Sequence, residues 1–329
     1  MFRFSLLVFL AVSVSGCPPK GTKVLSENVS QQEIGPKTDA ILDANIKTIL
    51  FYRENDLLSA PVTYMGGFDP LTLEFDEIRD LNSRESEFFV DIQACNEYWE
   101  PAPILPIQFY DGFTQDRIQE YQRSEFTKVD YVHYRYQFPQ ENEAFLMSGN
   151  YLIKVFRDGN PNAVVLTRRF VVVEPLVGIS LANELSQNPR RRRMEAVSLL
   201  VNPGNLNVFN PMTDLHVNLV PNFRFDRTAE LRPRQMMENS LFFEVDLFQT
   251  FPFGHEFRPL DIRSTRFLSP SVQDVEERDE IFDVYLFPGA PWLTNTFGRQ
   301  PDLNGNYFIE VQEWPNPNVQ SDYVYTYFS

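Results

Sequence analysis

Residues 131–138 read Tyr-Val-His-Tyr-Arg-Tyr-Gln-Phe, and their alternation is the clearest structural signal in the chain. Apolar and aromatic residues occupy every second position: Val132, Tyr134, Tyr136 and Phe138. The positions between them fall on the opposite side: Tyr131, His133, Arg135 and Gln137. Successive side chains of a strand point to opposite faces, so this period predicts a β-strand with one buried face.

The same spacing of two recurs on both sides of this segment. It predicts further strands at 46–53, 71–76, 88–94, 151–156 and 164–173. Gly159 and Asn160-Pro161 separate the last two and predict a hairpin turn. Glu174-Pro175 ends the series. Residues 46–175 are therefore predicted to form a first β-sandwich of about seven strands, the size of an immunoglobulin-like domain.

A second series of strand-like segments follows the first. It covers residues 197–201, 215–220, 241–248, 262–267, 281–287, 307–311 and 323–328, and Asn304-Gly305 adds a hairpin signal. No helix longer than two turns is predicted, because Pro189 and Pro233 interrupt the only candidates. The predicted class is all-β, with two consecutive immunoglobulin-like or E-set-type β-sandwich domains, the second over residues 176–329.

The N-terminus has the order of a secretory signal. Arg3 supplies a positive charge, residues 6–12 form a short apolar run, and Val14-Ser15-Gly16-Cys17 resembles the lipobox of bacterial lipoproteins. The alternative, a buried strand ending in a free cysteine, does not explain this order. We therefore expect residues 1–16 to be a lipoprotein signal peptide and Cys17 to be the lipidation site that anchors the protein in a membrane.

The residues after Cys17 indicate a tether and a location. Residues 17–45 are polar, lack an apolar period and are predicted to be flexible. Surface-exported lipoproteins of the Bacteroidetes often carry acidic residues after the cysteine, whereas this chain continues with Pro18, Pro19 and Lys20. The expected location is therefore the periplasmic side of the outer membrane.

Composition excludes several classes of function. The chain has 329 residues, 43% of them hydrophobic, which is too apolar for a disordered protein. Its 29 Lys and Arg stand against 45 Asp and Glu, and the resulting net charge of −16 argues against binding of nucleic acid. The basic run at 190–193 is accordingly interpreted as a solvated loop. With Cys17 acylated, Cys95 has no partner for a disulfide and is expected to be inert.

No motif predicts catalysis or a bound metal. His255-Glu256 begins a zinc-protease pattern, but Pro259 stands where the second histidine is needed. Asp302 and Asn304 resemble calcium ligands, yet the downstream glutamate is missing and a hairpin turn explains both residues. We therefore predict no catalytic residue, no cofactor-binding residue, no metal site and no enzymatic activity.

Several short motifs together resemble the plug protein of the type 9 secretion system of Bacteroidetes. They occur in the family's order: Cys95-Asn96-Glu97-Tyr98-Trp99, Tyr110-Asp111-Gly112-Phe113, residues 133–139 with Glu141-Asn142, Ser148-Gly149-Asn150-Tyr151, residues 166–170, Val173-Glu174-Pro175, Asn210-Pro211, Phe251-Pro252, residues 254–258, Asp261-Ile262-Arg263-Ser264 and Asp302-Leu303-Asn304-Gly305. The resemblance covers residue 46 to the C-terminus.

The resemblance implies a function that the residues alone do not reveal. Plug proteins are periplasmic β-sandwich proteins that seal the periplasmic opening of the large outer-membrane translocon barrel, and the family is not an enzyme family. Its members usually continue into a further C-terminal β-domain, whereas this sequence stops at Ser329. The partners implied are the barrel and, through Cys17, the membrane.

A glycan-binding lipoprotein on the periplasmic or outer surface is the alternative. Such a module needs aromatic side chains that are open to solvent and have polar partners beside them. Trp99, Trp292 and Trp314 are the available tryptophans. Trp99 lies within the plug-like motif, where we expect it to pack in the core.

Overall fold

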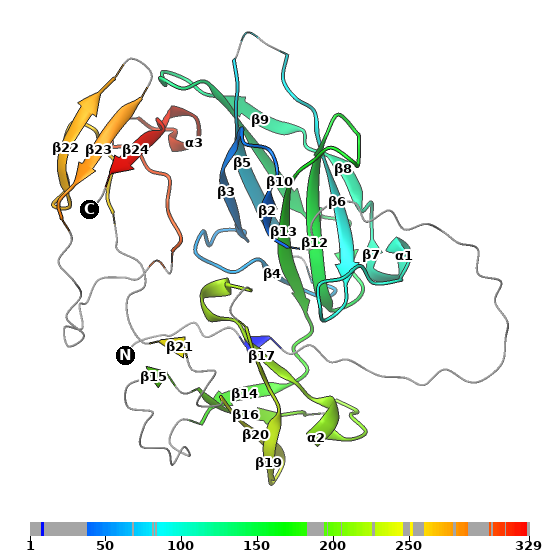
Figure 1. Ribbon diagram of the computed structural model, residues 1–329. Coiled ribbons are helices and arrows are strands. Elements are labelled where there is room, and N and C mark those ends of the chain that lie inside the picture. The colour runs from blue at the N-terminus through cyan, green and yellow to red at the C-terminus, as the bar shows by residue number, and fades with distance from the viewer. Residues whose placement is uncertain are drawn as a thin grey trace. The chain divides into compact units, whose positions relative to one another are not determined.

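A computed structural model of the chain describes residues 8–9, 38–67, 69–80, 82, 84–182, 194–195, 197–204, 206–225, 228–245, 251–252, 260–278, 281–288, 303, 305–312 and 314–327. The described residues form many short strands and a few one-turn helices, which confirms the predicted predominance of β-structure (Figure 1). None of the helices in these ranges has the length and apolarity needed to span a membrane.

The chain divides into two compact units. The larger unit contains Gly35–Val172 and His255–Ser329, and the smaller unit contains Met1–Ile34 and Val173–Gly254. The division at residue 172 lies close to the predicted domain boundary at 175. Residues 255–329 cluster with the first domain and not with residues 173–254.

Two sheets form the body of the larger unit (Figure 1). The first has the order β3-β5-β10-β9, with bounds Ile46–Arg53, Leu71–Ile78, Tyr131–Phe138 and Glu120–Arg123. The second has the order β2-β13-β12-β6-β8, with bounds Ala40–Ile41, Val164–Val173, Gly149–Arg157, Phe88–Cys95 and Gln115–Arg117; β4 (Val62–Tyr64) pairs with β13. The predicted hairpin is confirmed, because β12 and β13 pair antiparallel across the turn at Gly159.

One hydrophobic core lies between these two sheets. The inward side chains of β5 and β10 share a single buried cluster with those of β6, β12 and β13. Phe75 of the first sheet meets Phe88 of the second with ring centroids 5.2 Å apart, and Phe138 meets Phe170 at the same distance. Edge-to-face contacts of this kind add to the burial of apolar area. The predicted inward face of β10 is confirmed in full: Val132, Tyr134, Tyr136 and Phe138 are buried.

The opposite face of β10 corrects the prediction of a single buried face. Tyr131 and His133 are only 1% and 5% exposed, while Arg135 and Gln137 are half-buried. The cover comes from residues 305–312 and 314–327, named here the C-terminal arm. Its hydrogen bonds to the first sheet span more than 180 residues of sequence, so no local pattern around β10 could reveal them.

Smaller elements complete the larger unit. Helix α1 (Pro106–Phe109) leads directly into β7 (Tyr110–Asp111), which pairs with β11 (Ala144–Phe145). A three-stranded sheet has the order β22-β23-β24, with bounds Val272–Glu277, Phe282–Leu286 and Val324–Tyr327. Its last pair is parallel, and helix α3 (Pro317–Gln320) precedes β24.

The smaller unit has its own core. Its main sheet has the order β14-β16-β20-β19, with bounds Gly178–Leu181, Ser198–Asn202, Ser240–Glu244 and Pro233–Met237. A second sheet has the order β1-β17-β18, at Val8–Phe9, Val217–Leu219 and Ala229–Leu231; β15 (Met194–Glu195) pairs with β21 (Phe251–Pro252). Helix α2 (Pro211–Asp214) and the 3-10 turn η3 (Pro221–Phe223) are short. Inward residues of β16, β17, β18 and β20 form the core. The immunoglobulin-like or E-set type of these sheets stays a prediction.

Two of the predicted strands are wrong. Residues 262–267 form turns because side chains capture nearby backbone amides: Asp261 accepts from Arg263, and Ser264 accepts from Phe267. Residues 307–311 pair with no strand in the part of the chain that the structure describes, and the Tyr307 hydroxyl instead donates to the carbonyl of Ile49 on β3 at 3.1 Å. Alternation of apolar and polar residues indicates an extended backbone, but it does not show whether a second strand lies beside that segment to form hydrogen bonds with it.

Candidate functional site

The predicted lipidation site cannot be placed in the fold. Cys17 lies outside the described residues, as do the arginine run 190–193, His255 and Trp292. Within the described ranges, no three His, Cys, Asp or Glu side chains come together in a group that could hold a metal ion.

Cys95, the other cysteine, ends strand β6 and is half-buried with a free thiol. Its sulfur lies 3.8 Å from the carbonyl oxygen of Gln93. Burial raises the pKa of the Cys95 thiol to about 11, and the nearby Lys154 offsets only part of that rise. The thiolate is the reactive form of cysteine, so this environment suppresses nucleophilic chemistry at neutral pH.

Cys95 should therefore react slowly until the protein unfolds. In a Cys17→Ala protein, where Cys95 is the only cysteine, alkylation by iodoacetamide at pH 8 is expected to be at least tenfold slower in buffer than in urea. The raised pKa places the increase in folded-state reactivity near pH 11. Equal rates in buffer and urea at pH 8 would show that the fold does not protect the thiol.

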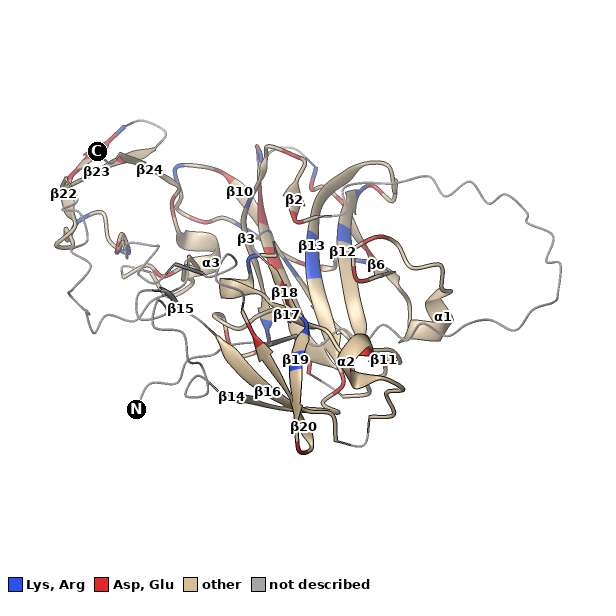
Figure 2. Ribbon diagram, turned by 60° about the horizontal axis from the view of Figure 1, so that its bottom comes forward, with Lys and Arg blue, Asp and Glu red and all other residues tan. Residues whose placement is uncertain are grey.

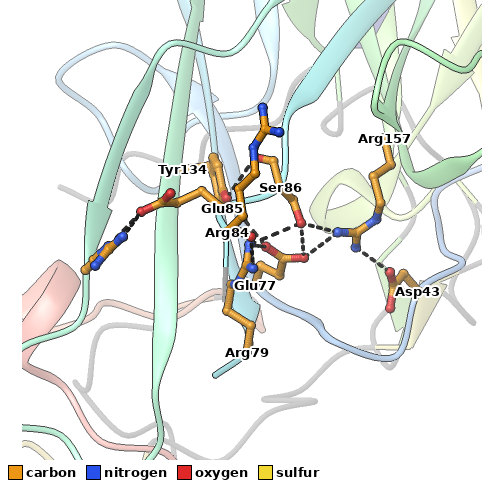
Figure 3. Close-up of polar contacts among 9 residues, drawn as sticks. Asp43, Glu77, Arg79, Arg84, Glu85, Ser86, Tyr134 and Arg157 are labelled. Atoms are coloured by element: carbon orange, nitrogen blue, oxygen red, sulfur yellow. Dashed lines mark hydrogen bonds and ion pairs between the residues drawn. The ribbon is translucent and has the colours of Figure 1, made fainter. Parts of the chain in front are cut away.

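An ion cluster joins the two sheets at one end of the core (Figure 3). Glu77 projects from β5 and is only 4% exposed, and Arg157 reaches it from the end of β12. Arg157 also donates to Asp43 at 2.7 Å. Ser86 donates to Glu77 at 2.8 Å, and Arg79 pairs with the same carboxylate at 3.3 Å.

The partners of Arg157 explain how its charge is retained inside the protein. Burial opposes that charge, but hydrogen bonds to Glu77 and Asp43 outweigh burial and raise the pKa of Arg157. The guanidinium also lies 4.9 Å from the ring centroid of Phe88, a core residue of the second sheet. Each of these contacts of the buried Glu77 carboxylate joins its strand to the other sheet or to a loop. The arrangement serves to lock the sheets together.

A second polar cluster fixes the C-terminal arm to the outer face of the first sheet. The buried Asp76 of β5 lies 2.7 Å from Nδ1 of His133 and accepts a hydrogen bond of 2.7 Å from the Tyr323 hydroxyl. Thr48 of β3 lies 2.7 Å from the same hydroxyl. Burial and the Asp76 carboxylate raise the pKa of Tyr323, so its hydroxyl keeps its proton and remains a donor.

Further contacts extend this attachment along the arm. The Tyr131 hydroxyl donates to the carbonyl of Ser321 at 3.0 Å, and its ring meets Tyr323 edge-on at 5.5 Å. The amide of Lys128 donates to Asp322 at 2.6 Å, and its ammonium pairs with Glu277 at 2.7 Å. His133 thus lies buried against Asp76 beneath the arm.

Removal of one hydroxyl should loosen the arm. In Tyr323→Phe, Asp76 loses a donor while the ring contact with Tyr131 remains, and a hydrogen bond to a charged group stabilises by about 1.5–3 kcal/mol. Amide hydrogen exchange over residues 317–327 is expected to speed up at least tenfold, with little change in β12 and β13. Tyr325→Phe, at an exposed position of β24, is the matched control. An unchanged exchange rate in Tyr323→Phe would show that this bond does not hold the arm.

The motif around Asn96 builds a tight turn at the end of β6. The side-chain oxygen of Asn96 accepts from the amides of Tyr98 and Glu100, each at 2.9 Å. Trp99 adopts a positive φ of 63° in this turn, and the guanidinium of Arg169 lies 5.2 Å from its ring centroid. The asparagine shapes the turn, and the turn places the tryptophan under β13. Trp99 is half-buried, not fully in the core as expected.

The motif around Gly112 builds a second ordered loop, which presents Phe113. Glu143 accepts a hydrogen bond from the Tyr110 hydroxyl at 2.8 Å and others from the amides of Phe113 at 3.3 Å and Gln140 at 3.1 Å. Gly112 has a φ of 152°, and a Cβ there would lie 2.7 Å from the Glu143 carboxylate. Glycine is therefore required for the loop to close on Glu143.

Comparison with known proteins agrees with these motifs. A family model described as the type 9 secretion system plug protein first domain matches residues 46–174. Residues 46–174 are therefore similar to the first domain of plug proteins. The plug match covers the two sheets of the larger unit except β2, the Asn96 and Gly112 loops, and the inter-sheet ion cluster except Asp43. The plug family is a structural rather than a catalytic family.

One solved structure is similar to this chain over more than the residues matched by the family model. A crystal structure of a hypothetical protein from Parabacteroides merdae ATCC 43184 is 25% identical, with a TM-score of 0.79 over 88% of this chain and 73% of that one. A DNA-bound alkylpurine DNA glycosylase AlkC from Pseudomonas fluorescens is 8% identical over 40% of this chain and 30% of that one, with a TM-score of 0.23, too low to indicate a shared fold. No curated protein matches the chain.

Proposed function

We propose that the chain is a non-enzymatic plug that binds and seals the periplasmic opening of the type 9 secretion translocon barrel. The match of residues 46–174 to the plug first domain carries this proposal. Sealing a wide pore requires a rigid obstacle, and the core and ion cluster between the two sheets supply rigidity. The proposed lipid on Cys17 holds the protein on the periplasmic side of the outer membrane and raises its concentration near the barrel.

Deletion of the gene tests the sealing role. Loss of the plug is expected to admit a large antibiotic or dye that wild-type cells exclude, and deletion of the barrel as well is expected to restore the barrier. The double deletion is the control, because a general membrane defect would persist in it. Equal uptake by wild-type and plug-deleted cells that contain the barrel would overturn the proposal.

Acylation is tested at the cysteine itself. Metabolic labelling with a fatty acid is expected to mark the wild-type protein and to be lost in Cys17→Ala, which should then be released with the soluble periplasmic fraction. Cys95→Ala is the matched control and should label like the wild type. Label that persists in Cys17→Ala would refute the anchor.

The glycan-binding alternative receives less support from the aromatic residues. Arg169 lies over Trp99, and Phe126 stacks on Trp314 with centroids 5.5 Å apart, so one ring face is occupied in each of the two tryptophans that the structure describes. A sugar-binding platform needs an open ring face. Affinity purification from native membranes separates the two functions, since recovery of the barrel supports the plug and recovery of polysaccharide-uptake components supports the alternative.

A further inference from the structure

Several large apolar side chains are exposed to solvent at one edge of the larger unit. We name this surface the apolar tip; it consists of Leu105, Ile107, Phe113, Leu146 and Met147, all classed as exposed. Ile107 is 78% exposed and Phe113 is 81% exposed. Figure 1 places α1 beside β7 here, and the strand pair β7–β11 brings residues 146–147 next to them. An apolar surface of this kind on a soluble domain marks an interaction site.

The tip is held in shape by its buried neighbours. Phe109 and Tyr110, which stand between the exposed residues of the segment, are 2% and 1% exposed and anchor α1 and β7 in the core. The amide of Leu146 donates to the carbonyl of Phe109 at 2.8 Å. Glu143 holds the loop of Phe113 as described above. Phe113 and Ile107 are therefore exposed on an ordered scaffold, and binding through them loses little conformational entropy.

The two chain segments that carry the tip contain acidic residues but no basic ones, although Arg169 of β13 reaches the Trp99 turn of the first segment. Residues 94–116 and 136–153 contain no Lys or Arg. They contain six acidic residues: Glu97, Glu100, Asp111, Asp116, Glu141 and Glu143. In Figure 2 the chain around α1 is tan and red, whereas β12 and β13 carry blue bands. A partner that fits this surface needs an apolar recess with Lys or Arg at its rim.

We propose that the apolar tip is the surface through which the plug docks on the translocon barrel, in an apolar recess bordered by basic side chains. This inference rests on the proposed function and adds which surface of the plug makes the contact. A second copy of the chain fits poorly, because two tips would bring acidic rims together. Exposed aromatic and aliphatic anchors with a charged rim are the usual anatomy of a protein interface.

Photo-crosslinking in cells that contain the barrel tests the docking surface. A photoreactive amino acid at position 113 is expected to crosslink to the barrel, and one at position 209 is not. Phe209 is fully exposed in the smaller unit and is the matched control. Crosslinking of position 209 but not of position 113 would overturn the proposed surface while leaving the plug function intact.

Affinity measurement with full-length protein completes the test. The double variant Ile107→Ser/Phe113→Ser is expected to bind the purified barrel at least tenfold more weakly than wild type, and Phe209→Ser is expected to bind like wild type. Higher salt should also slow association of the wild-type protein, because the acidic rim steers it. Both variants change exposed side chains, and equal urea midpoints with wild type verify the fold.

Each remaining outcome has one interpretation. Equal binding by the double variant and wild type would refute docking through the tip, and the plug would then contact the barrel elsewhere. Failure of wild-type protein to bind the barrel at all would refute the proposed function itself. A dimer of the chain that the double variant abolishes, together with unchanged binding to the barrel, would assign the tip to self-association and overturn the inference.

Discussion

Tyr134→Ala is expected to lower the free energy of unfolding of the larger unit by about 3–5 kcal/mol, the range for truncation of a large buried side chain. Tyr134 is 1% exposed. Its ring stacks on Phe75 at 5.3 Å and meets Phe88 edge-on at 4.8 Å. Its hydroxyl donates to the carbonyl of Ser86 at 3.2 Å. Alanine would leave a cavity between the sheets and remove this donor. Urea unfolding followed by near-ultraviolet circular dichroism measures the loss.

Two neighbouring changes provide the controls. Tyr134→Phe keeps the ring and removes the hydroxyl, so a loss of about 1 kcal/mol is expected. Gln137→Ala removes a neutral, half-buried side chain on the opposite face, so only a small loss is expected. A loss for Gln137→Ala as large as that for Tyr134→Ala would mean that the core does not depend on the face that contains Tyr134.

Arg157→Met is expected to cost about 3 kcal/mol of stability. The substitution keeps an apolar side chain against Phe88 but leaves Glu77, 4% exposed, without its closest cation. Its remaining partners are Arg79, Ser86 and Tyr134. Breaking a buried ion pair from one side costs about 3–5 kcal/mol, because the other charge stays buried. Because Arg79 still pairs with Glu77, the expected loss lies at the lower end of this range. Chemical unfolding of both proteins at neutral pH gives the difference.

The double variant Arg157→Met/Glu77→Leu distinguishes the origin of that loss. With Glu77 replaced as well, the buried carboxylate is gone, but Asp43 and Arg79 each lose a partner, so part of the lost stability should return. The coupling free energy between the two sites should then exceed about 1 kcal/mol. Additive losses would show instead that Arg157 acts only through its packing on Phe88 and its bond to Asp43.

Strong alternation predicted the sheets of the first domain well. The segments at 46–53, 71–76, 88–94 and 131–138 are strands, because each faces a core that selects every second residue. The alternation did not predict the burial of the outer face of β10. Tyr131 and His133 occupy the positions expected to face solvent, but the C-terminal arm covers them. The strand predicted at residues 262–267 is also absent. There, the side chains of Asp261 and Ser264 accept hydrogen bonds from backbone amides that a strand would use to pair with its neighbour.

The candidate interaction site was only partly predictable. The Asn96 and Gly112 motifs were found by resemblance, and their turn-forming residues have local causes that a sequence can show. The exposure of Ile107 and Phe113 could not be predicted, because a run of apolar residues between buried aromatics normally continues into the core. The absence of Lys and Arg from residues 94–116 was visible in the sequence, but its meaning needed the neighbouring positions of α1, β7 and β11.

The C-terminal arm also has a consequence for the order in which the protein is made. The ribosome completes strands β3, β5 and β10 well before it reaches Tyr323, which lies 247 residues after its partner Asp76. Until then, His133 and Asp76 remain exposed to water, because the C-terminal arm does not yet cover the outer face of the first sheet. Closing so long a loop makes folding slow, since distant contacts form late. The larger unit therefore reaches its final state only after Tyr323 has been synthesised.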